Sequence, residues 1–478
     1  MKPTGNRHRI LFCVALVIAS GWAAEAQTKA AAAAPSAAVR ERTVRAHLEF
    51  LAADALRGRG SGSHDELVAA TYISAQLRQY GIQPLGDQGG YLQTVELSRR
   101  ELAAPPEVIF RSPDARETRW KHGNEMVVMN LATERISGPL QKIDGTAATP
   151  DSVQPGAMVF LKPRAGASIY GQAIALVQAG AAAVLVAETP RIRSHWDAFA
   201  AHPPELPGHI KGSKPGMSWT GVALTTETAA VVEALPPGTE IRLEAPLKPQ
   251  QPAYTWNVVG SIPGRDPQLK QQAILLSAHL DHVGEGKAVN GDSIYNGADD
   301  DASGVAAVLE LARALSSGLR PRRTVVFALF GSEENGGFGS RYFREHPPVP
   351  LAQIVANLQF EMIGRPDPKV APRTLWLTGY ERSNLGPQLA AHGARLVADP
   401  HPDQEFFQRS DNYVLAKEGV VAHTVSSYGL HQQYHQPDDE IRLIDFAHMV
   451  DAITSMIAPV RWLANSPFVP QWKPGRKP

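Results

Sequence analysis

Five short segments in the second half of the chain combine acidic residues or histidine with a preceding apolar run. Histidine and carboxylate groups are the ligands of catalytic zinc, and a further carboxylate can serve as a base. In open α/β proteins such residues gather outside the carboxyl ends of the strands. The segments therefore predict a metallohydrolase with two zinc-like ions and one spare base. They are AILLSAHLDHV (273–283), GADDDASG (297–304), VVFALFGSEENGG (325–337), ANLQFEMIG (356–364) and QQYHQPDD (432–439).

The first segment places His279 at the end of a predicted strand and Asp281 two residues further on. Alternate residues of a strand share a face. The carboxylate of Asp281 can therefore accept a hydrogen bond from the second ring nitrogen of His279 and fix its tautomer, as is usual around a metal-bound imidazole. Taken alone, the two residues are more simply interpreted as a surface His–Asp pair.

Two further segments carry adjacent carboxylates. Asp299, Asp300 and Asp301 precede a predicted helix, where capping would explain one or two of them. The mutual repulsion of three favours a cation, and one of them could bridge two metals, although spacing does not say which. Glu333 and Glu334 follow a continuous apolar strand. Neighbours at a strand end point in different directions, so one can bind metal while the other holds the attacking water.

The last two segments contribute one acid and one histidine. Glu361 directly follows the apolar strand IVANLQF, and His435 lies in a polar loop after GVVAHTVSS. His431 lies four residues before His435, so on a helix the two would share a face. Spacing alone leaves either histidine as the ligand. Any one of these residues, taken singly, is best interpreted as a surface polar group.

Composition limits the class of protein. The chain has 478 residues, enough for two or three domains, and 43% hydrophobic and 20% charged residues, which is ordinary for a globular protein. Lys and Arg number 47, as do Asp and Glu, so no global field favours nucleic acid or an anionic membrane.

The N-terminus has the pattern of a cleaved secretory signal peptide. Arg7 and Arg9 precede an apolar run at 10–19 that is too short for a membrane anchor, and an A-x-A site predicts cleavage after Ala26. The only cysteine, Cys13, leaves with this segment. The mature chain then has no thiol for catalysis, zinc or disulfides. Export without disulfides favours a periplasmic or secreted bacterial enzyme.

The remaining pattern predicts an α/β protein with an insertion. Helical periodicity runs through 41–80, and alternating strands and helices from 257 onward predict a mostly parallel mixed sheet between helices. Pro and Gly are frequent and strands short in between, which indicates a smaller β-rich inserted domain. The expected organisation is signal peptide 1–26, Ala-rich lead-in 27–39, N-terminal part of the peptidase domain 40–104, insert 105–250, catalytic domain 251–465 and tail 466–478.

In their order, these motifs resemble those of bacterial secreted aminopeptidases with a co-catalytic di-zinc site, whose relatives include glutamate carboxypeptidases and glutaminyl cyclases. The resemblance covers roughly 257–463. It implies a zinc-exopeptidase fold, two Zn²⁺ ions per chain, and peptide substrates with a free N-terminus. The insert resembles a protease-associated domain. The motifs are AHLDHVG, GADDDASG, FGSEENGGFGS, NLQFEMIG, RSDNY and YHQPDD.

The resemblance also implies a role for each motif residue. It implies Asp300 as the bridging carboxylate and Glu333 as the general base that acts on a metal-bridging water. It implies Tyr434 as a donor to the oxyanion and Arg409 as a neighbour of the bound substrate's terminus. The other metal ligands that it implies are His279, Glu334, Glu361 and His435.

One departure and several alternatives remain. The family most often has Asp where this chain has Glu361, which is one methylene longer and can still bind zinc. A carboxypeptidase or dipeptidase could use the same arrangement of site residues. A carboxypeptidase would need a basic pocket for the terminal carboxylate, and Arg409 is a single candidate for it. A one-zinc glutaminyl cyclase conflicts with keeping both His279 and Asp300. A non-catalytic peptide-binding protein conflicts with the intact Glu333.

Overall fold

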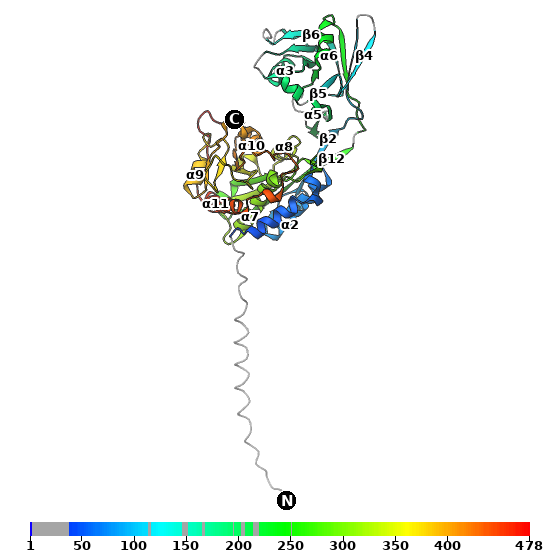
Figure 1. The fold of residues 1–478 in the computed structure, drawn as a ribbon. Helices are drawn as coiled ribbons and strands as arrows, with labels where there is room; N and C mark the ends of the chain where they lie inside the picture. The colour runs from blue at the N-terminus through cyan, green and yellow to red at the C-terminus, as the bar shows by residue number, and fades with distance from the viewer. Residues whose placement is uncertain are drawn as a thin grey trace.

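The computed structural model describes Met1 and residues 38–112, 116–145, 152–164, 168–194, 196–201, 206–213, 219–249 and 251–478. The predicted signal peptide and most of the Ala-rich lead-in lie outside these residues. Among the described helices, none has the length and apolar character needed to cross a membrane. The described chain forms two bodies, each built around its own sheet (Figure 1).

The larger body contains a ten-stranded mixed sheet. Its four central strands are parallel, and antiparallel strands flank them on both sides. The prediction of an α/β fold on a mixed sheet is confirmed. In spatial order the strands are β19 (Leu396–Ala398), β18 (Leu375–Leu377), β20 (Val421–Ser426), β17 (Ile354–Phe360), β13 (Ala273–His279), β16 (Thr324–Phe330), β12 (Pro252–Ile262), β2 (Leu92–Arg100) and β9 (Leu206–Ile210), with β1 (Gln83–Pro84) also paired to β12.

Helices cover both faces of this sheet. One face packs against α1 (Glu41–Leu51), α2 (His64–Gln79), α7 (Gly304–Ser316), α9 (Leu385–Ala391) and α11 (Phe446–Asn465). The other face packs against α8 (Phe338–Glu345) and α10 (Asn412–Glu418). The sequence has helical apolar periodicity at 304–317 and 443–463, which agrees with α7 and α11 to within a few residues.

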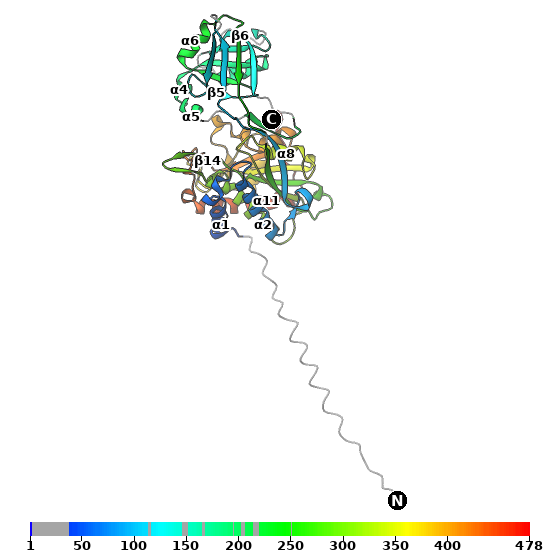
Figure 2. The ribbon, with the colours of Figure 1, turned by 90° about the vertical axis from the view of Figure 1, so that its right-hand side faces the viewer.

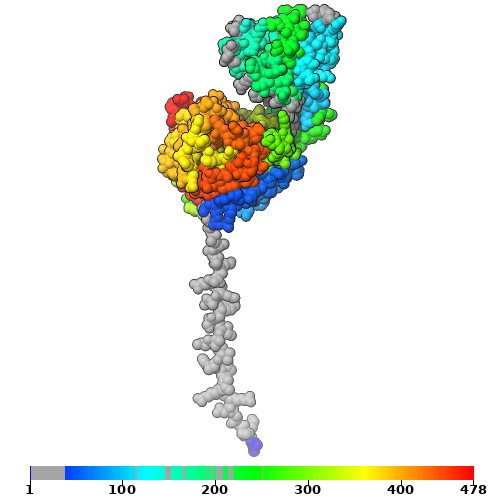
Figure 3. Space-filling model, viewed as in Figure 1, coloured from blue at the N-terminus to red at the C-terminus, as the bar shows by residue number. Residues whose placement is uncertain are grey.

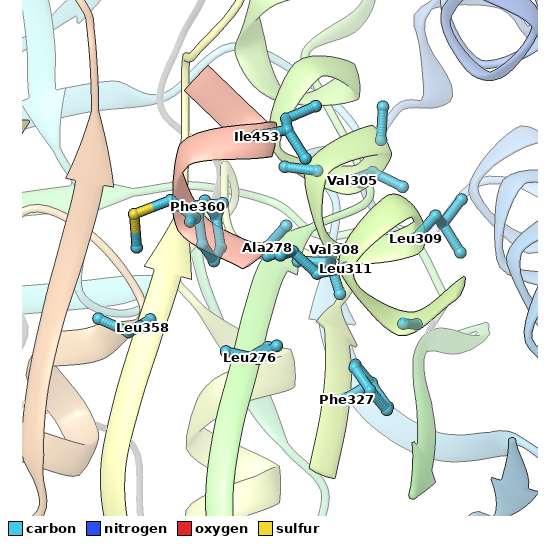
Figure 4. Packing of buried hydrophobic residues seen from close by; sticks show 14 of the residues in the cluster. Leu276, Ala278, Val305, Val308, Leu309, Leu311, Phe327, Leu358, Phe360 and Ile453 are labelled. Carbon is cyan, nitrogen blue, oxygen red and sulfur yellow. The ribbon is translucent and has the colours of Figure 1, made fainter. Parts of the chain in front are cut away.

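Strand β13 shows why the central strands read as continuous apolar runs. Leu276 and Ala278 join the core on the α7 face, and Leu275 joins the core on the opposite face. Figure 4 shows Ala278 beside Val308 and Leu311 of α7. Because both faces are covered, the strand is buried along its whole length and loses the alternation of a half-exposed strand. His279 is the last residue of β13, so it lies at the carboxyl-end edge of the parallel strands, where the candidate site forms.

The smaller body contains an eight-stranded sheet covered by α3 (Ile169–Gln178) and α6 (Thr226–Ala234). Residues 156–163 (GAMVFLKP) contain β7, and residues 170–188 contain most of α3 and all of β8. In spatial order the strands are β4 (Glu117–Lys121), β3 (Glu107–Arg111), β11 (Glu240–Glu244), β6 (Arg135–Asp144), β7 (Met158–Lys162), β8 (Ala183–Ala187), β10 (Gly221–Leu224) and β5 (Met126–Asn130).

The two bodies are joined along one side (Figures 1 and 3). There the chain leaves the larger sheet at the end of β2 and returns to it at the start of β12. Strand β9 lies inside the predicted insert, 105–250, yet pairs with β2 in the larger sheet. Its Ile210 shares an apolar cluster with Phe338 at the start of α8. The predicted insert therefore packs against α8, the helix that follows Glu333 and Glu334.

Candidate metal centre

Asp300 stands at the centre of the site. One carboxylate oxygen, Oδ1, lies 3.1 Å from Nε2 of His279, and the other, Oδ2, lies 3.2 Å from Nε2 of His435. His279 and Asp300 are buried, and His435 is about one-third exposed. The structure thus brings together the end of β13, the loop before α7 and the loop after β20, with one carboxylate facing two histidines.

Glu334 completes one side of this arrangement. Its Oε2 lies 3.0 Å from Nε2 of His435. Two atoms bound to one zinc at about 2.0 Å with a tetrahedral angle lie roughly 3.3 Å apart. The spacings among Asp300, Glu334 and His435 are therefore close to those of three ligands of one metal.

Glu361 and Glu333 are two further predicted site carboxylates whose pKa values respond to this group of residues. Glu361 directly follows β17, and its carboxylate accepts a hydrogen bond from the hydroxyl of Ser410. Burial raises the pKa of Glu361, and Asp300 and Glu334 add to this, against the opposing effect of His279. Burial also raises the pKa of Glu333 well above its ordinary value. Both predicted carboxylates therefore lie within one field of negative charge around Asp300.

The three consecutive aspartates have separate contacts. Asp301 accepts the backbone N–H groups of His279, Met362 and Gly304, which ties β13, the end of β17 and α7 together. Asp299 accepts from the backbone N–H of Gly364 at 2.7 Å. Of the three, Asp300 has its carboxylate beside both His279 and His435. This arrangement favours Asp300 as the bridging residue, which stays a prediction.

The late histidines also separate. His431 Nε2 lies 3.0 Å from Oδ2 of Asp299, whereas His435 faces Asp300 and Glu334. The helical arrangement that would put both histidines on one face is absent from residues 427–440, which form turns. The structure thus places His435, and not His431, beside the two carboxylates.

Asp281 supports the site mainly through backbone groups. Its Oδ1 accepts the N–H of Glu333 at 3.0 Å and its Oδ2 accepts the N–H of Glu334 at 3.3 Å. The predicted contact with His279 is looser, because Nδ1 of His279 lies 3.7 Å from the carboxylate and 3.2 Å from the backbone carbonyl of Asp281. Asp281 therefore fixes the turn that carries both glutamates and also faces the ring of His279.

Comparison with known proteins agrees with this geometry. Residues 257–460 match the profile of peptidase family M28, and every predicted metal ligand lies in that range. Residues 257–460 are an M28 peptidase domain. The predicted resemblance to a peptidase family is confirmed over these residues, and it agrees with the predicted class of enzyme, a zinc metallopeptidase.

Individual relatives match shorter stretches. Leupeptin-inactivating enzyme 1 of Streptomyces exfoliatus is 37% identical over 118 residues, which are 24% of this chain and 24% of that protein. A probable lipoprotein aminopeptidase of Mycobacterium tuberculosis is 38% identical over 96 residues, 20% of this chain and 17% of that protein. The matched segments thus span about a quarter or less of these two relatives.

Two solved structures share the fold over most of the chain. An aminopeptidase from Aneurinibacillus superposes with a TM-score of 0.57 at 19% identity and covers 92% of this chain and 96% of its own. A zinc aminopeptidase from Bacillus subtilis superposes with a TM-score of 0.51 at 18% identity, over 90% and 96%. At this identity the likeness concerns the fold.

Residues 57–66, a loop and the first turn of α2, support the M28 domain by hydrogen bonds to the backbone of its loops. The sequence analysis did not predict this role. Arg59 is fully buried and donates to the backbone carbonyls of Leu51, Leu280, Asn296 and Gly297. A guanidinium has the number and spread of donors needed to satisfy four carbonyls at once. It thereby joins α1 to the loops that follow β13 and precede α7.

Two more residues of this segment support the turn that carries Glu333 and Glu334. Ser61 donates its hydroxyl to Asp281, and buried Glu66 accepts the backbone N–H of Ser332 at 3.0 Å. The sequence shows only a Gly- and Ser-rich charged loop. One feature of the sequence could have indicated this role. Arg59 and Glu66 lie among Gly and Ser residues, in a segment with no apolar face to bury.

A pocket opens beside Glu361 in the M28 domain, with an empty volume of about 400 Å³. Trp376 and Phe406 stack in its wall with ring centroids 5.5 Å apart. Tyr434 also lines it, and its ring stacks on His435. Arg409 lies at the exposed rim, over the ring of Phe406. The two residues implied as substrate-facing, Tyr434 and Arg409, thus share one pocket next to a predicted ligand.

The donor set fits zinc. Although burial opposes charge on the ring, the carboxylates of Asp300 and Glu334 raise the pKa of His435 to about 10. Nε2 of His435 is buried and has no hydrogen-bond partner among the described residues. A histidine nitrogen without a partner, facing two carboxylates, attracts a cation. Histidine and carboxylate donors without thiolate are a usual catalytic zinc set.

Proposed function

We propose that the protein is a secreted, zinc-dependent aminopeptidase that removes the N-terminal residue of peptides. The arrangement of Asp300, with its two oxygens against His279 and His435, carries the proposal. It supports two metal positions that share one carboxylate. Glu361 would join His279 at one position, and Glu334 would join His435 at the other. Secretion rests on the signal-peptide pattern at 1–26.

When bound, zinc supplies Lewis-acid chemistry, since it polarises the scissile carbonyl and makes water a nucleophile near neutral pH. Glu333 is placed to take the proton of the attacking water on its carboxylate and then to pass that proton to the leaving amine. Tyr434 is placed to donate its hydroxyl hydrogen to the developing oxyanion.

Selectivity for a free N-terminus follows from charge beside the pocket. Glu361 lines the pocket. Burial raises the pKa of Glu333 and of Asp411, and the negative charge of Glu361 adds to both shifts. A protonated α-amine is attracted to such a cluster. The aromatic wall of Trp376 and Phe406 then faces the side chain of the terminal residue, which favours apolar residues there.

The test is a panel of aminoacyl-anilides and short peptides with free or blocked ends, run on the full chain with and without a strong chelator. We expect cleavage of free-amine substrates only, its loss in chelator and its recovery with zinc. Cleavage that requires a free carboxylate instead of a free amine would favour a carboxypeptidase. Full activity in verified metal-free protein would refute the mechanism.

A further inference from the structure

His282 is a buried residue of the site that neither the motif order nor the predicted ligand set includes. It lies between β13 and the hairpin of β14 (Gly284–Val289) and β15 (Asp292–Tyr295), which projects from the larger body in Figure 2. Its Nδ1 lies 2.8 Å from Oε1 of Glu334. The other oxygen of Glu334 faces His435. His282 therefore contacts the oxygen of Glu334 that is turned away from His435.

The ring of His282 is held in place from several sides. The backbone N–H of His282 donates to the carbonyl of Arg59 at 3.1 Å. A Cβ atom at Gly297 would lie 2.5 Å from Cγ of the ring, so only glycine admits the ring there. The edge of the ring meets His435 at a centroid distance of 5.6 Å. This packing fixes the direction of Nδ1 independently of Glu334.

The second ring nitrogen identifies the tautomer. Nε2 of His282 is buried and has no hydrogen-bond partner among the described residues. A buried N–H without an acceptor costs about 1–3 kcal/mol, and a neutral imidazole avoids this by carrying its proton on the other nitrogen. The arrangement therefore favours Nδ1–H donating to Oε1 of Glu334, with Nε2 as a lone pair.

The alternative is that His282 is itself a fourth ligand. His282, Asp300, Glu334 and His435 each offer one ligand atom within 4.8 Å of the others. However, Nδ1 of His282 lies 3.9 Å from Asp300, further than the 3.2 Å between His435 and the same carboxylate. Four protein ligands would also close the site, whereas a catalytic zinc keeps one position open.

We propose that His282 is a positioning residue that holds Oε1 of Glu334 by a hydrogen bond, so that Glu334 binds zinc through Oε2 alone. One coordination position then stays open to water and substrate. This inference rests on the zinc site of the proposed function. It concerns how the metal is held, and its readout is zinc affinity.

The test compares His282→Asn with His282→Leu in the full chain. An asparagine amide can place a donor near the position of Nδ1, whereas leucine fills similar space without a donor. Zinc affinity is measured for both sites by competition with a chromophoric chelator, and folding by thermal melting. We expect His282→Leu to weaken one of the two zinc sites by about 10–100-fold and to leave the other unchanged, since loss of such supporting contacts usually costs that much. His282→Asn should retain most of the affinity.

A double variant separates positioning from direct ligation. If His282 acts through Glu334, adding His282→Leu to Glu334→Gln should lower zinc affinity little beyond the loss in Glu334→Gln alone. Additive losses, or an asparagine variant as weak as the leucine variant, would overturn the inference in favour of direct ligation. Wild-type affinity at both sites in His282→Leu would also overturn it. A wild-type chain that binds two zinc ions but cleaves no peptide would refute the proposed function and leave this inference standing.

Discussion

The backbone N–H of Glu333 donates to Oδ1 of Asp281 at 3.0 Å, so a residue beside one predicted ligand fixes the turn that carries the predicted base. The neighbouring N–H, from Glu334, donates to the other oxygen of Asp281. With both amides held, the two glutamate side chains leave the turn in different directions. This relationship gives the two adjacent glutamates different expected roles.

We expect Glu333→Gln to keep both zinc ions and to lose activity by at least about 10²–10⁴-fold, the usual contribution of a general base. Glu334→Gln should lose zinc affinity as well, because Glu334 faces His435. Metal content and kcat of the two variants, measured side by side, check the assignment. The reverse pattern, with zinc lost only in Glu333→Gln, would exchange the two roles.

Glu361 is expected to bind zinc despite its extra methylene. The hydroxyl of Ser410 donates to this carboxylate and holds it against the pocket. Glu361→Asp should retain part of the activity, Glu361→Ala should retain little, and Ser410→Ala should fall between wild type and Glu361→Ala. Zinc stoichiometry and kcat/KM are the measurements. Unchanged zinc binding in Glu361→Ala would show that this carboxylate is not a ligand.

The two late histidines are expected to differ in kind. His435→Ala should lose one zinc ion, because its ring faces Asp300 and Glu334. His431→Ala should keep both zinc ions and cost about 1–3 kcal/mol of stability, because it removes the partner of the buried Asp299. Zinc titration and urea unfolding of each variant distinguish the effects. Loss of zinc in His431→Ala alone would contradict the placement.

His423 predicts a pH dependence of stability away from the metal. Burial lowers its pKa to about 4, while its ring contacts Ser383 and the carbonyl of Thr378. An unfolded histidine has a pKa near 6.5, so between these values the unfolded chain binds more protons and stability falls as the pH falls.

At pH 5 this difference amounts to about 2 kcal/mol relative to pH 7.5. We expect the free energy of unfolding of the wild type to fall by about that much more than that of His423→Asn over the same interval. Urea unfolding of both proteins at the two pH values measures the difference. Equal losses in the two proteins would show that His423 titrates normally in the fold.

Sequence patterns predicted the parts of the fold that local physics decides. The apolar runs became β13, β16 and β17, because a strand covered on both faces is apolar at most of its positions. Four of the five acidic or histidine motifs follow strands of the larger sheet, namely β13, β16, β17 and β20, whereas the loop with Asp300 follows the separate β14–β15 hairpin. The ligand set implied by the family resemblance stays a prediction. The structure brings all of these residues to one edge.

The contacts that cross the chain could not be predicted in this way. Arg59 reaches the carbonyls of Asn296 and Gly297, more than two hundred residues away, and nothing in its local sequence marks them. His282 lies next to a recognised motif, but only the packed position of Gly297 shows where its ring is held. Such supports depend on the approach of backbone segments, which a single sequence does not reveal.

Strand β9 also takes the place of β2 at one edge of the larger sheet. By pairing with β2, it occupies backbone groups that would otherwise form an open sheet edge, a template on which other chains can add strands. A chain shortened by excising all of 105–250 would expose that edge together with the apolar side chain of Phe338. If the shortened chain aggregates, the exposed edge of β2 explains the aggregation. An excision that keeps residues 206–213 beside β2 would leave that edge covered.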